Sequence, residues 1–343
     1  CRQISESAAP NVIYVLADDL GFGDLGAFNR EGKIKTPHLD QIARQGMIFT
    51  DAHTSSSVCT PTRYGILTGR YNWRSPLKRG VLSGTSQALI PKNRLTVASF
   101  LKSNGYQTAF IGKWHLGWDW AVNNSSFTNN PIRDDEIFEK IDFSKKINNS
   151  PNDLGFDYSY GHCGSLDMPP YVYVENQKIT AKVQNITERK GEYHWWRKGP
   201  TADDFDHERV TPHLIDKAEA FVTEINEKEK PFFLYLALPS PHTPILPTAE
   251  WRGKSGLNPY GDFVMQIDHH MGRINKLLDQ LGLSENTIVI FTSDNGCSPE
   301  AKFDILTQLG HDPSGVFRGY KADIFEGGHR VPFIAKWPMK IQP

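Results

Sequence analysis

The stretch NVIYVLADD (residues 11–19) decides the class of fold. Its apolar run VIYVLA contains no alternating polar residue, which is typical of a strand that is buried on both faces of a parallel sheet. Asp18 and Asp19 follow directly at the carboxyl end of this predicted strand. Open parallel sheets bind their ligands beyond the carboxyl ends of their strands, so these two carboxylates are candidates for a functional site.

A second stretch, TIVIFTSDN (residues 287–295), has the same order, with Asp294 and Asn295 after an apolar strand. Four oxygen donors at two strand ends suit Ca²⁺ or Mg²⁺, whereas Zn²⁺ prefers nitrogen or sulfur ligands. Either pair alone is more typical of a turn or a helix cap, and only their coincidence favours a metal site. Asp268, His269 and His270 are consecutive on a predicted helix, and we expect core-edge and solvent-facing roles for them.

Strand and helix patterns alternate along the rest of the chain. We expect further strands at 47–53, 106–114, 231–238 and 331–337, and helices at 38–45, 64–67, 95–103, 212–227 and 262–281. This alternation predicts an α/β fold with a mainly parallel central sheet flanked by helices. The stretch 121–212 lacks such periodicity, and we expect an irregular insertion there that faces the substrate.

The composition excludes several classes of protein. The 343 residues are 38% hydrophobic and carry a net charge of −1, which argues against a disordered tail and against a globally basic nucleic-acid binder. No apolar run approaches the roughly 18 residues of a membrane-spanning helix. The sequence therefore predicts a large folded domain without a transmembrane segment.

The two ends of the sequence carry their own expectations. Cys1 followed by a polar stretch to residue 10 suits a bacterial lipoprotein whose signal peptide has been removed and which is anchored by lipid at Cys1; a trimmed chain end is the alternative. We expect residues 1–10 to be a leader or linker and residues 11–343 to be the functional domain. The strand at 331–337 runs into Pro338 with no closing element, so we expect a further segment to be missing after it.

Basic residues dominate one segment. Between residues 52 and 118 the chain has no Asp or Glu but nine Lys or Arg: Arg63, Arg70, Arg74, Lys78, Arg79, Lys92, Arg94, Lys102 and Lys113. Such a run indicates either a solvated basic surface or a site for an anionic substrate. Nucleic acid is disfavoured, because the segment has no recognition-helix pattern and no aromatic-basic platform.

The motif CTPTR (residues 59–63) lies inside this segment, before a predicted helix that Thr60 would cap. A cysteine beside the positive end of a helix is a candidate nucleophile, and an inert buried thiol is the alternative. A cysteine-dependent phosphatase would need Arg six positions after Cys59, where this chain has Gly65. For Cys163 and Cys297 the sequence leaves both a disulfide and separate thiols open.

The motif C-x-P-x-R at residues 59–63 resembles the signature of the type I sulfatases, in which a formylglycine-generating enzyme oxidises the cysteine to an aldehyde. The similarity continues, in order, through NVIYVLADDLGFGDLG (11–26), TPHLDQIARQGMIFTDAH (36–53), LTGRYNWR (67–74), GYQTAFIGKWHLG (105–117), PHTP (241–244), TSDNG (292–296) and RGYKADIFEGGHRVPF (318–333). It covers nearly the whole chain. The resemblance implies an alkaline-phosphatase-like fold, with the usual C-terminal subdomain missing or truncated.

The resemblance also implies a role for each matched residue. Ca²⁺ would be held by Asp18, Asp19, Asp294, Asn295 and the formylglycine made from Cys59. Arg63 would orient the hydrated aldehyde, Lys113 and Lys321 would clamp the sulfate, His115 would be the base that expels sulfate, and His242, helped by Lys321, would protonate the leaving alcohol.

The blocks at residues 72–82 and 166–176 are similar to blocks of bacterial sulfatases that act on sulfated glycans. This resemblance implies a sulfated glycan as the substrate, and we expect a galactose or N-acetylgalactosamine sulfate at a chain end. Besides Lys113, His242 and Lys321, we expect Arg74, Asp167, Tyr171 and Trp195 to contact the sugar. The alternatives are a broad arylsulfatase, a two-zinc phosphatase or phosphodiesterase of the same superfamily, and a non-catalytic glycan-binding relative. The expected location is the periplasm or the cell surface.

Overall fold

The structure is a computed structural model that describes residues 9–122, 138–228 and 230–342. Cys1 and part of the predicted insertion lie outside the described residues. Within them, one sheet has the strand order β2-β11-β10-β1-β9-β3-β4-β5-β6, and β7 and β8 form a separate hairpin. The strands are β1 (Asn11–Asp18), β2 (Met47–Ile48), β3 (Gln107–Lys113), β4 (Tyr158–His162), β5 (Val174–Glu175), β6 (Lys178–Ile179), β7 (Val183–Arg189), β8 (Trp196–Ala202), β9 (Phe232–Pro241), β10 (Thr287–Ser293) and β11 (Phe333–Lys336).

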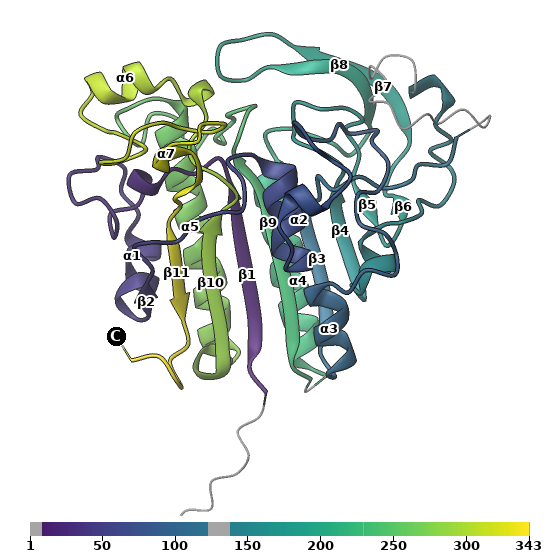
Figure 1. Ribbon diagram of the computed structural model, residues 1–343, viewed down its shortest axis with the longest axis horizontal. Coiled ribbons are helices and arrows are strands. Elements are labelled where there is room, and N and C mark those ends of the chain that lie inside the picture. Colours follow the sequence, from purple (N-terminus) through teal and green to yellow (C-terminus); the bar gives the residue numbers. More distant parts are fainter. Residues whose placement is uncertain (1–8, 123–137, 229, 343) are drawn as a thin grey trace, which may run out of the picture.

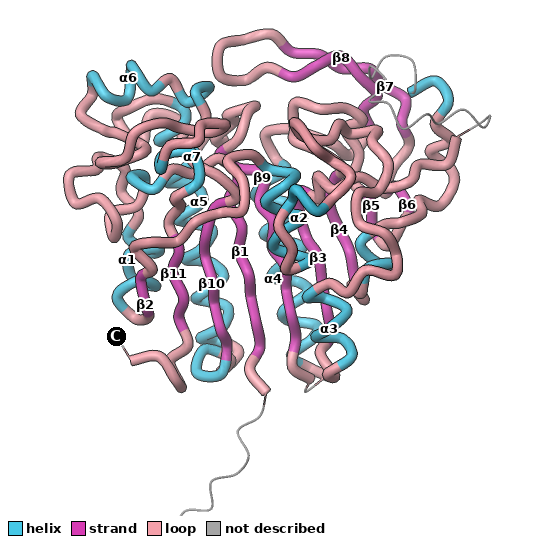
Figure 2. The backbone as a smooth tube through the Cα atoms, viewed as in Figure 1, coloured by secondary structure: helices cyan, strands magenta, loops and turns pink. Residues whose placement is uncertain are grey.

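The helices cover both faces of this sheet (Figures 1 and 2). They are α1 (Pro37–Arg44), α2 (Cys59–Thr68), α3 (Val97–Ser103), α4 (Val210–Asn226), α5 (Pro259–Gln280), α6 (Phe303–Gln308) and α7 (Glu326–His329). The long helices α4 and α5 pack against β9 on one face, and α2 and α3 lie on the other. The predicted α/β class is confirmed.

The centre of the sheet is parallel and its two edges are not. β10, β1, β9, β3 and β4 run in one direction, whereas β11 and β2 on one side and β5 and β6 on the other are antiparallel additions. All ten residues of β9 are buried, as expected for a strand covered on both faces. The carboxyl ends of the parallel strands therefore open toward the same edge, below the β7–β8 hairpin in Figure 1.

The structure differs from the sequence prediction at several elements; for example, the helices predicted at 64–67 and 262–281 begin earlier, at Cys59 and Pro259. The stretch 121–212 contains three strands of the main sheet, β4, β5 and β6, and the β7–β8 hairpin, so it is more regular than its weak periodicity indicates. The strand predicted at 47–53 is shorter in the structure: Met47 and Ile48 form β2 against β11, and further along the chain His53 makes an isolated antiparallel bridge with Arg330. The helix predicted from residue 212 begins earlier, at Val210.

Asp268 has a structural role, as predicted for the Asp-His-His run. Its carboxylate oxygens accept hydrogen bonds from the backbone N–H groups of His38 (3.3 Å) and Leu39 (2.7 Å), in the first turn of α1. These donors have no partner within their own helix, so Asp268 joins α5 to the start of α1. Among the described residues, no helix is both long and apolar enough to cross a membrane.

Candidate active site

The two strand ends with acidic and amide side chains lie side by side. β1 pairs in parallel with β10, so that the residues after each strand meet. The Asp19 backbone N–H donates to Asp294 Oδ1 (3.3 Å), and Asn295 Nδ2 donates to Asp19 Oδ1 (2.7 Å). Asp18, Asp19, Asp294 and Asn295 are each at most 1% exposed. The structure thus brings the four predicted metal ligands together.

The oxygens of this group are under-satisfied by protein alone. Asp18 Oδ1 and Asn295 Oδ1 are buried and have no hydrogen-bond partner among the described residues. Burial alone would raise the pKa of Asp18, but Lys113 and the other neighbouring cations hold that pKa well below its usual range. The pKa of Asp294 is instead raised to about 7, by burial and by the nearby Asp18 carboxylate. Carboxylates that share a site oppose each other's ionisation. A divalent cation bound by oxygen would satisfy both orphaned acceptors and allow both acids to ionise.

Cys59 is the first residue of α2. Val58 has an extended backbone (φ −144°, ψ 157°) and is the N-cap, so the predicted cap, Thr60, lies inside the first turn instead. Thr60 Oγ1 donates to the carbonyl of His115 (2.9 Å), which attaches the start of α2 to the segment after β3. The helix therefore begins at the position expected of a helix-terminal nucleophile.

The Cys59 thiol is buried among the predicted metal ligands. It is 2% exposed, and its Sγ and one ligand atom each of Asp18, Asp19 and His242 all lie within 4.8 Å of one another. Burial raises the pKa of the thiol to about 12, although Lys113 and other cations oppose this. An unmodified Cys59 is therefore a neutral thiol at neutral pH, not the thiolate that a cysteine nucleophile requires.

Three cations balance the three carboxylates: Arg63 and Lys113 are fully buried, and the Lys321 side chain is 16% exposed. The closest pairs are Lys113 with Asp18, Arg63 with Asp294 (2.8 Å) and Lys321 with Asp19 (2.8 Å). Arg63 NH1 also donates to the carbonyl of Lys113 (2.8 Å), so its guanidinium joins α2 to β3 and β10. The cluster is close to neutral without a metal ion, and a divalent cation would make it complementary to an anion.

The two predicted catalytic histidines have defined tautomers when neutral. His115 Nε2 lies 2.8 Å from the carbonyl of Leu82, and His242 Nδ1 lies 2.6 Å from the carbonyl of Thr243. A carbonyl only accepts, so these nitrogens carry the protons. His115 Nδ1 is left without a partner among the described residues, and His242 Nε2 lies 3.6 Å from Asp19 Oδ2. Burial lowers the pKa of both rings.

Three of the residues predicted to contact the sugar, Asp167, Tyr171 and Trp195, lie in and beneath the β7–β8 hairpin. Asp167 is 4% exposed and accepts from Arg197 NH1 (2.7 Å), and the Tyr171 hydroxyl, also buried, donates to the Arg197 carbonyl (2.7 Å). Trp195 is partly exposed, with its Nε1 3.3 Å from Glu300 Oε2. Tyr171 thus packs beneath the β7–β8 hairpin, which we call the rim. Trp195 and Arg197 remain accessible.

The basic segment does not form one anion site. Only Arg63 and Lys113 of its nine cations are members of the buried cluster. Arg74 lies on a short 3-10 helix (Asn72–Arg74) and is exposed. Two others form ion pairs near the opposite ends of the strands, Lys92 with Asp153 (3.5 Å) and Lys102 with Asp157 (2.6 Å). The run is therefore partly a solvated surface, the alternative considered from the sequence.

His162 is a neighbour of the site that sequence patterns miss. It ends β4, directly opposite Lys113 in the parallel register. Its Nδ1 donates to the carbonyl of Gly164 (2.8 Å), its Nε2 has no partner among the described residues, and burial lowers its pKa to about 3. No sequence pattern points to His162, because the stretch around it shows no strand periodicity.

His242 is likewise distant in sequence from all four predicted ligands. From the sequence, the lack of a histidine beside the acids argues against a two-zinc phosphatase. The structure brings His242 close to Asp19, so this argument is weaker than sequence spacing indicates.

Cys163 and Cys297 are not joined to each other: the Cys163 thiol donates to the carbonyl of Pro170 (3.5 Å) and the Cys297 thiol to that of Ser298 (3.6 Å).

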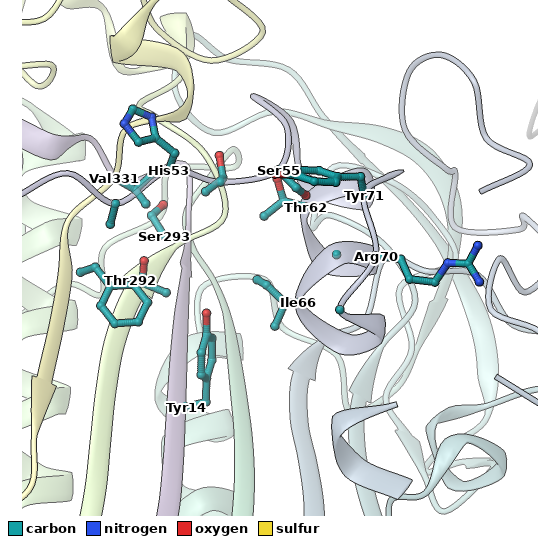
Figure 3. A pocket seen from close by; sticks show the side chains of 15 residues that line it. Tyr14, His53, Ser55, Thr62, Ile66, Arg70, Tyr71, Thr292, Ser293 and Val331 are labelled. Carbon is teal, nitrogen blue, oxygen red and sulfur yellow. The ribbon is translucent and has the colours of Figure 1, made fainter. Parts of the chain in front are cut away.

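A hollow of about 300 Å³ lies beside α2 but does not include the buried cluster (Figure 3). Thr62 and Ile66 line it from the helix, and Tyr14 and Thr292 line it from β1 and β10. Cys59 is not among its lining residues. This hollow is therefore separate from the predicted chemistry.

Comparison with known proteins identifies the family. The sulfatase family model matches residues 10–343. The chain is 34% identical to an N-acetylgalactosamine-6-O-sulfatase of Bacteroides thetaiotaomicron, over 98% of this chain and 69% of that protein. It is 32% identical to human arylsulfatase A, over 97% of this chain and 60% of that protein. The chain thus spans about 60–69% of the length of these relatives.

The fold comparison agrees. A solved Bacteroides thetaiotaomicron structure, described with the metabolism of multiple glycosaminoglycans, superposes with a TM-score of 0.83 at 34% identity, covering 98% of this chain and 74% of that chain. The family model matches nearly all of the residues, and the sequence relatives and the fold agree with it. The chain therefore belongs to the sulfatase family of sulfuric ester hydrolases.

Proposed function

We propose that this protein removes sulfate from carbohydrates, acting on galactose or N-acetylgalactosamine sulfate residues at the end of a glycan chain. The observation that carries the proposal is the burial of Cys59 among three carboxylates and three cations at the carboxyl ends of β1 and β10. The two similar proteins named as N-acetylgalactosamine-6-sulfatases, from Bacteroides thetaiotaomicron and from rat, favour this substrate class. The proposed location is outside the cytoplasm, in the periplasm or at the cell surface.

Oxidation of Cys59 to formylglycine is part of the proposal. The thiol is held neutral by burial, so the unmodified side chain is a weak nucleophile. The hydrated aldehyde would supply one hydroxyl to attack sulfur and a second whose deprotonation releases the sulfate. The partner required is a formylglycine-generating enzyme, acting before the site is closed by folding, because the Cys59 side chain is buried in the folded chain.

Calcium fits the oxygen donors that the protein leaves open. Asp18, Asp19, Asp294 and Asn295 would hold it, since all four are oxygen ligands and two of their oxygens have no partner within residues 9–122, 138–228 and 230–342. When bound, the ion would supply positive charge next to the sulfate group. Removing it with a chelator should lower both activity and thermal stability, and Ca²⁺ should restore both. Stoichiometric zinc in an active preparation would favour the phosphatase alternative.

Two of the three cations, Lys113 and Lys321, would bind the sulfate oxygens. Lys113 and Lys321 each carry three N–H donors, and their pairing with Asp18 and Asp19 leaves donors for an anion. In a water-poor site such fixed donors stabilise the negative charge that develops on transferred groups. Arg63 would act by position, because its guanidinium is already engaged by Asp294 and the Lys113 carbonyl.

The two histidines would move protons at opposite stages. In neutral His115 the proton is on Nε2, so Nδ1 carries a lone pair and can accept a proton as a base. His242 can act as the acid only with a second proton on Nε2, and burial and Lys321 disfavour that proton. An incoming sulfate ester is an anion, so substrate binding would raise the pKa of His242 toward the protonated form. This gives the acid its proton only when the leaving group is present.

The test is the release of sulfate by the protein co-expressed with a formylglycine-generating enzyme and loaded with Ca²⁺. N-acetylgalactosamine 6-sulfate, galactose 6-sulfate, an aryl sulfate and the matching aryl phosphate are compared, with protein made without the maturating enzyme as control. We expect sulfate release from a sugar sulfate, little release of phosphate, and an aldehyde mass at residue 59. Faster hydrolysis of the phosphate would overturn the proposal, and activity on the aryl sulfate alone would favour the arylsulfatase alternative.

A further inference from the structure

Two histidines from distant parts of the chain face each other at the surface. His53 lies on the loop between β2 and α2, where it is one of the residues that line the hollow in Figure 3, and His329 is the last residue of α7. Their Nδ1 atoms are 2.9 Å apart, and the side chain of His53 is 35% exposed. This pair is separate from the buried cluster and is not used in the proposed sulfatase reaction.

The partners of the other ring nitrogens decide where the protons are. His53 Nε2 lies 3.0 Å from Asp51 Oδ1, and His329 Nε2 lies 3.0 Å from the carbonyl of Ile324. A carboxylate and a carbonyl only accept, so both Nε2 atoms carry the proton in the neutral rings. Both Nδ1 atoms then direct lone pairs at each other. Such an arrangement is repulsive unless a proton or a metal ion lies between them.

A third ligand lies next to the pair. One carboxylate oxygen of Glu326 is within 4.8 Å of a ring nitrogen of both His53 and His329. Glu326 and His329 are three positions apart on α7, so they share one face of that helix. Arg330 NH1 holds Glu326 Oε2 (2.7 Å), and Arg330 NH2 lies 3.1 Å from Asp51 Oδ1. Arg330 thus orients the carboxylates of both Asp51 and Glu326.

We propose that His53, His329 and Glu326 form a surface site for a first-row transition metal of the Zn²⁺ type. Two imidazole nitrogens and one carboxylate are ligands that Zn²⁺ accepts and that Ca²⁺ disfavours. Ligating histidines almost always donate their second N–H to a carboxylate or a backbone carbonyl, which is what His53 and His329 do. The protein would therefore hold two cations of different chemistry, one at oxygens and one at nitrogens.

The site would connect two segments that carry residues of the buried cluster. His53 belongs to the segment that leads into Cys59, and His329 to the segment that begins with Lys321. The backbones already meet, through Thr54 N–H to the His329 carbonyl (2.8 Å) and Ala322 N–H to the Ser57 carbonyl (2.9 Å). A metal ion would add a side-chain link between them, so its expected effect is on stability rather than on the chemical step.

The test is Zn²⁺ binding by calorimetry, with millimolar Ca²⁺ present to occupy the oxygen-donor site. We expect the wild-type protein to bind one Zn²⁺ that His53→Ala and His329→Ala both lose, together with a rise in Tm on adding Zn²⁺ that the variants lack. His269→Ala, at an exposed histidine on α5, is the matched control and should bind as the wild type does. Asp51→Ala should weaken binding by about 10- to 100-fold, because it removes the acceptor for His53 Nε2.

Two results would overturn the site. If the wild type binds no Zn²⁺ at micromolar concentration, the pair is held by a shared proton instead. If His53→Ala and His329→Ala bind the same amount of Zn²⁺ as the wild type, the metal lies elsewhere, for example in the buried cluster with Cys59. Circular dichroism of each variant confirms folding, which surface substitutions at these positions are expected to preserve.

Discussion

The buried cluster and the rim formed by the β7–β8 hairpin carry similar side chains in opposite environments. In the cluster, the Arg63, Lys113, Asp18 and Asp294 side chains are 0% exposed. In the rim, Arg197 also pairs with a buried aspartate, but its side chain is 46% exposed. An ion pair in a low dielectric is strong and costly to break, whereas an exposed one is screened and exchanges with water. The comparison indicates that the side chains of the cluster are held rigidly by their ion pairs, whereas Arg197 in the rim is free to exchange its contacts with water.

The largest expected effect is at residue 59. Cys59→Ser cannot yield formylglycine through thiol oxidation, and a serine sulfate ester has no second hydroxyl to expel the sulfate, so turnover should fall on the order of 10³-fold or more. Substrate binding should remain, because Lys113, Lys321 and the rim are untouched. Steady-state kinetics and a binding titration on the same sugar sulfate measure the two effects. Near wild-type turnover would show that the formylglycine mechanism is wrong.

The two histidines should separate by substrate, each with losses of about 10²- to 10⁴-fold. His242→Ala should reduce turnover of a sugar sulfate far more than that of an aryl sulfate, because only the sugar alkoxide needs a proton to leave. His115→Ala should slow both substrates toward a common rate and let a sulfate adduct accumulate on residue 59. Rate measurements with both substrates and mass spectrometry of residue 59 test this. Equal losses for His242→Ala on the two substrates would mean that the roles are assigned wrongly.

The stability effects of two arginines test the contrast between cluster and rim directly. Arg63→Ala leaves buried carboxylates without their partner and should lower the free energy of unfolding by about 3–5 kcal/mol. Arg197→Ala removes a half-exposed pair and should cost no more than about 1 kcal/mol. Urea denaturation of both variants, with Ca²⁺ present throughout, gives the two values. Similar losses for both would contradict the difference drawn between the two environments.

The buried cluster was the more predictable of the two regions, for a physical reason. Asp18, Asp19, Asp294 and Asn295 follow apolar runs whose burial is visible in the sequence, and parallel strands place their carboxyl ends at one edge of the sheet. The motif at Cys59 is local as well. Resemblance to a known family was needed for His242, because no pattern near it indicates the fold that brings it to Asp19.

The rim was less predictable because its contacts depend on pairing between distant segments. Tyr171 is in a stretch with aromatic residues typical of a sugar site, yet its hydroxyl is directed to the Arg197 carbonyl inside the fold. The same holds for β4 outside the rim: its apolar pattern is too short to be recognised, although it joins the parallel sheet beside β3. Where short strands are held by register with remote partners, sequence periodicity carries little information.

An expected effect smaller than that of Arg63→Ala concerns the attachment of the hairpin at acidic pH. The His207 ring stacks on Trp196 of β8 with ring centroids 3.9 Å apart and an angle of 11° between the planes, and burial lowers the pKa of His207 to about 3. When the hairpin opens and His207 is exposed to water, its pKa returns to about 6.5. Because the exposed ring binds a proton more readily than the buried one, protonation favours the open hairpin. The stability that the neutral ring provides is complete above about pH 6.5 and is lost as the pH falls toward 3. At pH 5 the loss should be about 2 kcal/mol.

Hydrogen exchange of the β7 and β8 amides at pH 7 and pH 5, corrected for the intrinsic exchange rate, measures this opening. Protection in the hairpin should fall by about 30-fold at pH 5, the equivalent of about 2 kcal/mol, while amides of β1 and β10 should change less. His207→Phe keeps an aromatic ring against Trp196 and removes the titrating group, so its hairpin should show no such dependence on pH. If the variant keeps the full pH dependence, then other groups control the opening, and the rim is held in place by contacts other than this stack.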